Sequence, residues 1–222
     1  MSDEIDRLRR LDSCAISDAL DRHSVGGATN LLQELTPSRR VAGRAVTVLL
    51  GPPPTGGDAR GGPVRHLGSA AVDSSGPADI IVVAHQGRTD CAGWGGLLSR
   101  GAVARGVTGV IIDGAARDVA EAAELGMAVY GRARTPVTVR GRATEHAWDV
   151  PIEIAGITVR PGDLVLADDG GVVVVPAEHS HQVLTTAESI AAVEASMASA
   201  IDAGTPVSEV MGKTYEELTG DS

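Results

Sequence analysis

Three short apolar segments in the middle of the chain alternate with two stretches of helical periodicity. Residues 79–84, 108–112 and 127–130 have the composition of strands, and helices are predicted at about 95–105 and about 118–125. This alternation is typical of βαβ units, in which parallel strands are joined by crossover helices. We therefore predict an α/β fold with a central βαβαβ unit.

The residues before this unit add a helix and a strand. Apolar residues recur at helical spacing through residues 3–23, where Ser13 or Ser17 could cap a break in the helix. Residues 41–50 are predicted to form a strand, and residues 63–72 a short helix.

The residues after this unit are mostly β-rich and then helical. Glycine and aspartate turns separate the short β segments, and one such turn is expected at Asp168-Asp169-Gly170-Gly171. We expect these segments to form a second layer of one domain that spans residues 1–222, with a C-terminal helical extension over about 178–222. The predicted elements are β segments at 135–140, 151–160, 163–167 and 171–175, and an alanine-rich helix at 178–203.

The composition argues against several kinds of partner. The net charge is −10, so the chain lacks the basic surface of a nucleic-acid-binding protein. It has no apolar run long enough to span a membrane, and its N-terminus lacks the apolar stretch of a secretory signal, so we expect a cytoplasmic protein without membrane contacts. Cys14 and Cys91 form no CxxC pair, which favours two reduced thiols, although a disulfide stays open.

Two loops should hold the ligand, because the carboxyl ends of parallel strands form the usual crevice of α/β proteins. The first loop, at residues 85–93, leads to the turn Gly95-Gly96-Leu97-Leu98. Unpaired N–H groups at the start of the following helix can bind a carboxylate. The alternative is a tight turn that only packs Trp94 on the core.

The second loop ends in Arg117 and Asp118 at the start of another helix. An arginine fork can bind a carboxylate or keto oxygen at two points. The neighbouring aspartate can bind Mg²⁺ or Mn²⁺. The alternative is that Asp118 only caps its helix and Arg117 forms a surface ion pair.

A family resemblance favours the ligand-binding interpretation. Residues 93–118, GWGGLLSRGAVARGVTGVIIDGAARD, strongly resemble the RraA-like superfamily, which has a swivelling β/β/α domain. The superfamily contains the 4-hydroxy-4-methyl-2-oxoglutarate/4-carboxy-4-hydroxy-2-oxoadipate aldolases and the regulators of ribonuclease E activity. The resemblance extends to SCAISDAL at 13–20, VAGRAVTV at 41–48 and VPIEIAGITVRPGDLVLADDGGVVVVP at 150–176.

The resemblance implies roles for specific residues. In the aldolases, the residues at the positions of Arg117 and Asp118 orient pyruvate and bind the metal, and the turn at Leu97 and Leu98 donates backbone N–H groups to the substrate. The regulators tend to lack the aspartate, so its presence here favours an enzyme over a regulator that binds a protein partner. The resemblance also implies a homotrimer or a hexamer.

Position 96 departs from the aldolase pattern, which has an acidic residue there to order water on the metal and aid proton transfer. His85 and Asp90 are candidates for this role, although each fits a loop hydrogen bond as well. The aldolases also use a glutamate from a neighbouring subunit. Glu194 is the best match for that residue and Glu188 the second. The alternative for either, and the more common role on an alanine-rich helix, is a solvated charge.

The lysine content bears on the mechanism. Cleavage of a carbon–carbon bond beside a carbonyl leaves an enolate, which enzymes stabilise with a lysine Schiff base or a metal ion. The only lysine is Lys213, in a polar tail, so a divalent metal is favoured. We expect a lyase that cleaves a 4-hydroxy-2-oxo diacid or decarboxylates oxaloacetate, since both reactions give the enolate of pyruvate.

Other motifs have simpler interpretations. His179 and His181 are expected to be exposed near the start of a helix, although they could form a metal-binding pair. Cys91 has no base at a suitable spacing for a nucleophile. The aspartate-rich turn at 168–171 is expected to close a hairpin, because the remaining positions of a calcium loop are apolar.

Overall fold

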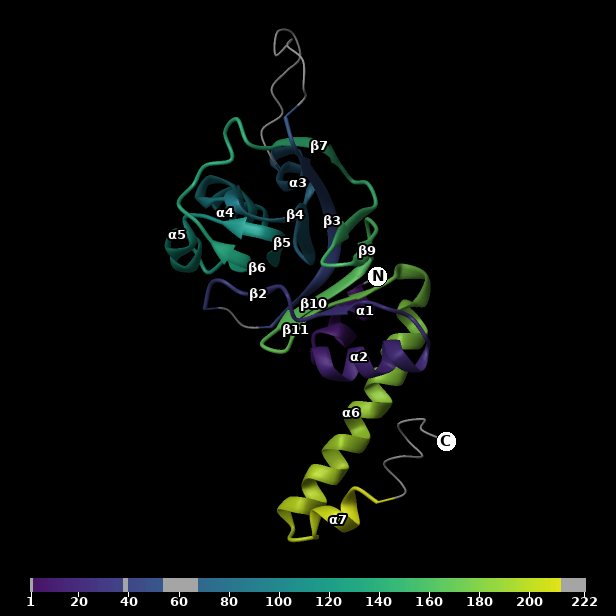
Figure 1. The fold of residues 1–222 in the computed structure, drawn as a ribbon. Coiled ribbons are helices and arrows are strands. Elements are labelled where there is room, and N and C mark those ends of the chain that lie inside the picture. Colours follow the sequence, from purple (N-terminus) through teal and green to yellow (C-terminus); the bar gives the residue numbers. More distant parts are fainter. Residues whose placement is uncertain (1, 38–39, 54–67, 213–222) are drawn as a thin grey trace.

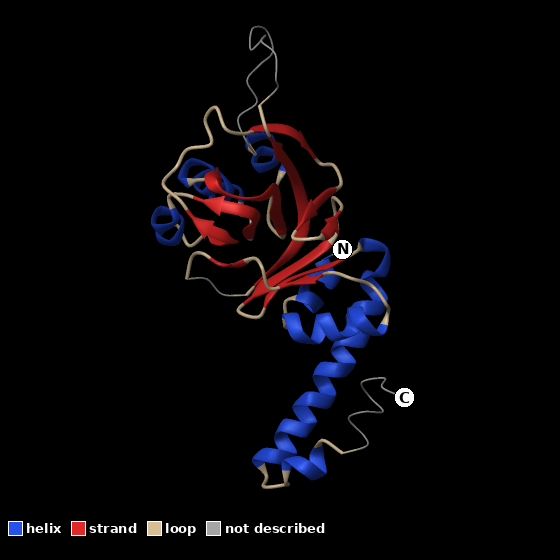
Figure 2. Ribbon diagram, in the orientation of Figure 1, coloured by secondary structure: helices blue, strands red, loops and turns tan. Residues whose placement is uncertain are grey.

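The computed structural model describes residues 2–37, 40–53 and 68–212. It consists of a curled nine-stranded sheet, a separate two-stranded sheet, helices that flank them and a long helix that extends away from the large sheet (Figures 1 and 2). The helices are α1 Ser2–Leu8, α2 Ser13–Arg22, α3 Ser69–Ser74, α4 Gly96–Arg105, α5 Val119–Glu124, the 3₁₀ helix η1 Ala177–His179, α6 Ser180–Asp202 and α7 Val207–Val210. The strands are β1 Ala28–Thr29, β2 Gln33–Glu34, β3 Val41–Gly51, β4 Asp79–Trp94, β5 Gly109–Ala116, β6 Ala128–Arg134, β7 Thr144–Trp148, β8 Ile152–Ile154, β9 Ile157–Val159, β10 Leu164–Asp168 and β11 Gly171–Val175.

The predicted βαβαβ unit is confirmed. Strands β4, β5 and β6 lie side by side and parallel, and β3 adds a fourth parallel strand next to β4. Helices α4 and α5 are the two crossovers. Together with α3 they lie on one side of the parallel strands, over an apolar cluster that includes Val83, Ile112 and Val129.

The sheet curls until its ends meet. Its strand order is β1-β11-β10-β3-β4-β5-β6-β2, and the two end strands, β1 and β2, follow each other in the chain. The phenol of Tyr130 in β6 donates to the carbonyl oxygen of Ala167 in β10 at 3.4 Å, across the interior. Apolar side chains from both halves fill that interior. The β-rich C-terminal segments therefore form a second layer that is continuous with the parallel strands.

The β-rich region differs in detail from the prediction. Residues 135–140 form no strand. Pro136 lacks an N–H, and the backbone bonds to neighbouring strands are isolated ones, from Thr135 N to Ala116 O at 3.0 Å and from Ala92 N to Val137 O at 2.9 Å. The segment predicted at 151–160 is a hairpin of β8 and β9. Its turn residues Ala155 and Gly156 both have positive φ, as a type I′ turn requires. The turn at 168–171 joins β10 and β11 in a hairpin, as predicted.

The N-terminal helix predicted at 3–23 is two helices. Neither Ser13 nor Ser17 caps the second one. Instead, Asp12 accepts a hydrogen bond from Ala15 N at 2.8 Å, and Ser13 donates from its hydroxyl to the buried Asp168 at 2.6 Å. Both helices pack with the first half of α6 on the other side of the sheet.

The C-terminal helix predicted at 178–203 is confirmed as η1 followed by α6. Only its first half is packed on the sheet and α2, because the buried residues of α6 end at Ile190. The second half and α7 extend away from the sheet (Figure 1). Within the described ranges, no helix is both long and apolar enough to cross a membrane.

Candidate active site

The two predicted loops meet at the carboxyl ends of β4 and β5. Trp94 and Ala116 are register partners at the ends of these strands, and the backbone N–H of Arg117 donates to Trp94 O at 3.0 Å. The residues that follow each strand, Gly95-Gly96 and Arg117-Asp118, are thereby held next to each other. Gly95-Gly96 leads into α4, which begins at Gly96, and Arg117-Asp118 directly precedes α5.

Asp118 points toward α4 and does not cap its own helix. It occupies the N-cap position of α5 with φ 55° and ψ 33°, and its side chain makes no capping hydrogen bond. Aspartate tolerates this left-handed conformation better than most residues, although it costs about 1 kcal/mol or more. The carboxylate oxygen Oδ2 instead accepts hydrogen bonds from Gly96 N at 3.1 Å and from Arg117 Nε at 3.0 Å.

These contacts keep the Asp118 carboxylate charged. The hydrogen bond from Gly96 N, followed by that from Arg117, holds its pKa below the ordinary value of 3.8, against the opposing effect of partial burial. In the described ranges its other oxygen, Oδ1, has no hydrogen-bond partner, and the side chain is 39% exposed. Asp118 therefore presents one free anionic oxygen to a ligand.

Arg117 and the start of α4 supply donors around this oxygen. The Arg117 side chain is 41% exposed, and among the described residues only its Nε is hydrogen-bonded, so both terminal nitrogens can bind an anion. The backbone N–H groups of Leu97 and Leu98 likewise have no acceptor in the described part of the chain. The Leu97 side chain is 86% exposed.

Trp94 also packs on the core, as the alternative interpretation of the turn proposed. It is buried, and its indole N–H donates to Ser99 Oγ at 2.9 Å. This hydrogen bond connects the first turn of α4 to the buried Trp94. The two interpretations are therefore compatible: the turn packs Trp94 and still leaves the N–H groups of Leu97 and Leu98 unpaired.

The donor set fits a hard divalent cation that is bound mainly by water and ligand. Within residues 2–37, 40–53 and 68–212, no group of three histidine, cysteine or acidic side chains could form a complete protein cage. Mg²⁺ is often held by only one or two carboxylates, with water and substrate oxygens as the other ligands. Asp118 Oδ1 suits this arrangement.

The two candidates for the acidic role, His85 and Asp90, are held by other contacts. The His85 ring is 1% exposed, its Nε2 lies 3.1 Å from Cys91 O, and burial lowers its pKa, which favours the neutral form. Asp90 forms an exposed ion pair with Arg88 at 2.7 Å. The region 85–93, predicted as a loop, is part of the long irregular strand β4. None of these contacts involves Asp118.

A different acidic residue lies beside Gly96. A Cβ atom added at Gly96 would overlap Glu121 Oε2 and would lie 2.9 Å from Glu121 Cδ and 3.2 Å from Asp118 Cβ. Glu121, in the first turn of α5, is therefore next to Gly96 and Asp118. The sequence patterns do not single out this residue. Its only signal was its position three residues after Asp118, one helical turn on.

The two C-terminal glutamates are in different environments. Glu188 is bound by Arg7, whose Nε and Nη2 donate to its two oxygens at 2.8 Å each. Glu194 is exposed on the second half of α6, away from α4 and α5 of the same chain (Figure 1). Glu194 can therefore reach an Asp118 site only in another copy of the chain.

The remaining motifs give no second catalytic centre in the described residues. Both cysteines are free. The Cys91 thiol lies 3.6 Å from His85 Nε2, so a base is next to this thiol, although the sequence spacing did not predict one. Cys91 is fully buried and burial raises its pKa, which disfavours the thiolate. His179 is hydrogen-bonded to Gln182 at 2.7 Å. Lys213 lies outside the described residues.

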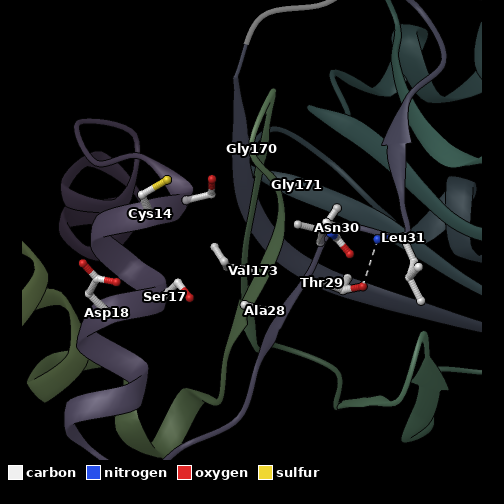
Figure 3. Close-up of a pocket in the computed structure, with 12 residues that line it drawn as sticks. Cys14, Ser17, Asp18, Ala28, Thr29, Asn30, Leu31, Gly170, Gly171 and Val173 are labelled. Atoms are coloured by element: carbon white, nitrogen blue, oxygen red, sulfur yellow. Dashed lines mark hydrogen bonds between the residues drawn. The ribbon is translucent and has the colours of Figure 1, made fainter.

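A separate concavity of about 540 Å³ lies between α2, β1 and the β10–β11 turn (Figure 3). Its polar lining includes Ser17, Asp18 and Asn30, and Cys14 lies beside it. Burial raises the pKa of the Cys14 thiol, so this cysteine is not an activated nucleophile. Neither Arg117 nor Asp118 lines this concavity, so it is separate from the candidate site.

The geometry agrees with the family to which the sequence is similar. Residues 13–174 match the family model described as RraA-like, Aldolase/RraA. The chain belongs to the RraA-like family. This match includes every residue of the candidate site on α4 and α5, and it ends before α6.

RraA-like relatives with curated names include aldolases. A protein of Halalkalibacterium halodurans, provisionally named 4-hydroxy-4-methyl-2-oxoglutarate aldolase, is 31% identical over 84% of this chain and 82% of its own length. Protein DlpA of Legionella pneumophila is 27% identical over 94% of this chain, and the aligned part spans 33% of DlpA.

Solved RraA-like structures share the fold. An uncharacterized protein from Pseudomonas syringae has a TM-score of 0.84 and 29% identity, with 95% of this chain and 97% of that chain covered. RraAS2 of Streptomyces coelicolor, described as an unusual member of the RNase ES inhibitor RraA protein family, has a TM-score of 0.74 and 27% identity, with 85% and 93% covered. The family therefore includes proteins named as enzymes and proteins named as inhibitors.

Proposed function

We propose that this RraA-like protein is a divalent-metal-dependent lyase that releases pyruvate from a 4-hydroxy-2-oxo diacid, from oxaloacetate, or from both. One observation carries the proposal: the free Oδ1 of a charged Asp118 lies beside the open fork of Arg117 and the unpaired N–H groups of Leu97 and Leu98. A relative named as an aldolase aligns over most of the chain and supports the same conclusion.

The residues have distinct tasks in this proposal. Asp118 would hold Mg²⁺ or Mn²⁺, which supplies Lewis-acid stabilisation of the negative charge that develops on the keto oxygen. Arg117 binds the substrate carboxylate or keto oxygen through its terminal nitrogens. The backbone N–H groups of Leu97 and Leu98 bind another substrate oxygen, where preformed donors are worth several kcal/mol in the transition state, or about 100-fold or more in rate.

The exposure of the site supports an assembly. Arg117 and Asp118 are about 40% exposed in the single chain, and exclusion of bulk water would strengthen the electrostatic stabilisation of an enolate. The second half of α6 is rich in alanine, carries Glu194 and extends away from its own sheet. We propose that copies of the chain form a trimer or a hexamer, in which Glu194 approaches the Asp118 site of a neighbour.

A coupled pyruvate assay with lactate dehydrogenase tests the function. The protein is incubated with several 4-hydroxy-2-oxo diacids and with oxaloacetate, after treatment with EDTA and after addition of Mg²⁺ or Mn²⁺. We expect pyruvate release above the metal-only background, loss of release with EDTA and recovery with metal. Release that is unchanged by EDTA would contradict the proposed metal dependence.

A non-catalytic regulator is the second candidate function. RraAS2 and a Thermus RraA, named as inhibitors of RNA-processing proteins, share the fold with TM-scores of 0.74 and 0.57. This candidate predicts no pyruvate release from any oxo acid and stable binding of a partner protein. The charged Asp118 with its free oxygen favours the enzyme, because a surface that only binds a protein has no need for this arrangement.

A further inference from the structure

One buried carboxyl group outside the candidate active site has an oxygen without a partner. Glu145 lies on β7 and is 9% exposed, and its Oε1 has no hydrogen-bond partner in the described part of the chain. Its register partner on β3 is Leu50, which belongs to the apolar cluster that α3, α4 and α5 cover. A buried polar atom without a partner is costly, so the presence of this side chain calls for a reason.

The other oxygen of Glu145 fixes the start of α3. Oε2 accepts a hydrogen bond from Gly68 N at 2.7 Å. Gly68 is the N-cap residue of α3 and has no side chain with which to cap the helix, and Glu145 binds its N–H from a neighbouring strand. Among the described residues this N–H is the only donor to the carboxyl group. A displacement of Gly68 would therefore leave the buried carboxyl group without any partner.

Gly68 in turn lies against the first turn of α4. It has a φ of 66°, a left-handed conformation that favours glycine, and a Cβ there would lie 3.3 Å from Trp94 Cζ3 and 3.7 Å from Leu98 Cδ1. The indole N–H of Trp94 donates to Ser99 in the same turn of α4. The backbone at Gly68 is thus part of the surface on which this turn packs.

A second contact joins α3 and α4 further along both helices. A Cβ at Gly101 would lie 3.2 Å from Val72 Cγ1, so the two helices are in close contact at this point too. Helix α3 has only six residues, and Glu145 fixes its N-terminal end. A shift of that end would move the first turn of α4, which carries the N–H groups of Leu97 and Leu98.

We propose that Glu145 is a positioning residue for the lyase reaction: by fixing Gly68, it keeps the N–H groups of Leu97 and Leu98 oriented toward a substrate oxygen. This inference rests on the proposed function and adds to it a residue that does not touch the substrate. The alternative is that Glu145 only stabilises the fold. The two interpretations differ in their consequences for the folded protein, because preformed donors stabilise an oxyanion only while they stay aligned.

The test compares two substitutions of Glu145. Glu145→Gln keeps an oxygen that can accept from Gly68 N, whereas Glu145→Leu fills a similar space and has no acceptor. In the pyruvate assay with Mg²⁺, we expect kcat/KM to fall by about 10-fold to 100-fold in Glu145→Leu and to stay within about threefold of wild type in Glu145→Gln. Glu153→Leu is the matched control, because Glu153 is exposed on β8, and it should leave kcat/KM unchanged.

Ligand binding separates positioning from folding. Oxalate is a planar dianion that resembles the enolate of pyruvate, and calorimetric titration measures its Kd in the presence of Mg²⁺. We expect this Kd to rise by about 10-fold or more in Glu145→Leu, while the Kd of Mn²⁺ alone stays within about threefold, since Asp118 would bind the metal. If Glu145→Leu lowers only the unfolding temperature and leaves kcat/KM and the oxalate Kd unchanged, Glu145 is a structural residue and the inference is overturned.

Tryptophan fluorescence follows the contact with Gly68 directly. The chain has two tryptophans, so Trp148→Phe leaves Trp94 as the only one. In this background, the emission of Trp94 should shift to longer wavelength in Glu145→Leu and not in Glu145→Gln, because Gly68 no longer covers the ring. An unshifted emission in Glu145→Leu would overturn the inference. Gly68→Ala strains the same backbone and should reproduce both the shift and the loss of kcat/KM, and it decides the question if Glu145→Leu does not fold.

Failure of the inference can be told apart from failure of the proposed function. If the wild-type protein releases no pyruvate from any oxo acid, the proposed function is wrong, and the role of Glu145 is wrong with it. If wild type is active and both Glu145→Leu and Gly68→Ala match its kcat/KM, only the inference is overturned. Equal losses in Glu145→Gln and Glu145→Leu would also overturn it, because glutamine keeps the acceptor for Gly68 N.

Discussion

The backbone nitrogen of Gly96 lies 3.1 Å from Oδ2 of Asp118, although the two residues are 22 positions apart in the sequence. This hydrogen bond connects the first residue of α4 with the residue that precedes α5. It uses one N–H group of α4 to orient a carboxylate, and it leaves the next two N–H groups for a ligand. The arrangement depends on β4 and β5 being parallel neighbours, since only then do both helices begin at the same edge of the sheet.

Replacement of Asp118 by asparagine should abolish lyase activity without unfolding the protein. The side chain is partly exposed and does not cap α5, and asparagine also tolerates positive φ, so the free energy of unfolding should change by no more than about 0.5 kcal/mol. The loss of a metal-binding anion should lower kcat/KM by at least about 100-fold. Pyruvate release and thermal unfolding, measured on the same sample, check both statements. Full turnover by Asp118→Asn would show that the metal site is elsewhere.

Arg117→Lys should weaken substrate binding while keeping the charge. Lysine cannot reproduce the planar fork, and hydrogen bonds to charged groups are worth about 1.5–3 kcal/mol, so kcat/KM should fall by about 10-fold to 100-fold. Arg105→Lys, an exposed change at the end of α4, is the control and should have no effect on kcat/KM. Equal kinetics of Arg117→Lys and wild type would indicate that Arg117 is only a surface ion-pair partner.

The sequence predicted the parallel strands well and the second half of β4 poorly. Residues 85–93 contain glycine, aspartate and other polar residues that are typical of a loop, yet they continue β4. The strand accommodates them by bulges: its register against β5 shifts three times after Ala84, and Gln86 and Gly87 have positive φ. Periodicity cannot reveal such a strand, because each bulge reverses which side chains face the core.

Only the part of the site that is formed by residues adjacent in the sequence was predicted. Arg117 and Asp118 are neighbours in the sequence, and their place after a strand indicated a ligand crevice. Glu121 was not predicted, because its contact with Gly96 joins residues that are far apart in sequence through the packing of α4 on α5. Similarly, Asp12 and not a serine caps α2, since Ser13 is engaged by Asp168 across the fold.

Acid should release the N-terminal helix from α6. Hydrogen bonds from Arg7 hold the pKa of Glu188 below its ordinary value of 4.5, and a hydrogen bond from Ser180, followed by one from Arg44, does the same for Glu4. As the pH falls, these two carboxylates therefore become protonated in the unfolded chain before they do so in the folded protein. The stabilisation is complete above pH 4.5 and is lost as the pH falls through the lower pKa values of the folded state.

The comparison of Glu188→Gln with wild type measures this effect. The variant should have a lower unfolding temperature at pH 7, and the difference from wild type should shrink when the pH is lowered to about 3.5. Glu178→Gln is the control, an exposed change on η1, and should match wild type at both values. If the difference in unfolding temperature between Glu188→Gln and wild type instead grows as the pH falls, the lowered pKa assigned to Glu188 is wrong.

Active sites shared between subunits should be detectable by mixing two inactive variants. If Glu194 serves the Asp118 site of a neighbouring copy, Asp118→Asn and Glu194→Gln are each impaired alone. After they are unfolded together and refolded in equal amounts, about one site in four should combine a native Asp118 with a native Glu194, so activity should return to about a quarter of wild type. The pair Asp118→Asn and Arg117→Lys is the control. Both residues of a site come from the same chain, so mixing these two variants cannot produce a site in which both are native. The activity of this mixture should be no more than the average of the two variants. If the mixture of Asp118→Asn and Glu194→Gln is no more active than the average of its two variants, Glu194 lies outside the site. Size-exclusion chromatography of the same samples shows whether assemblies have formed.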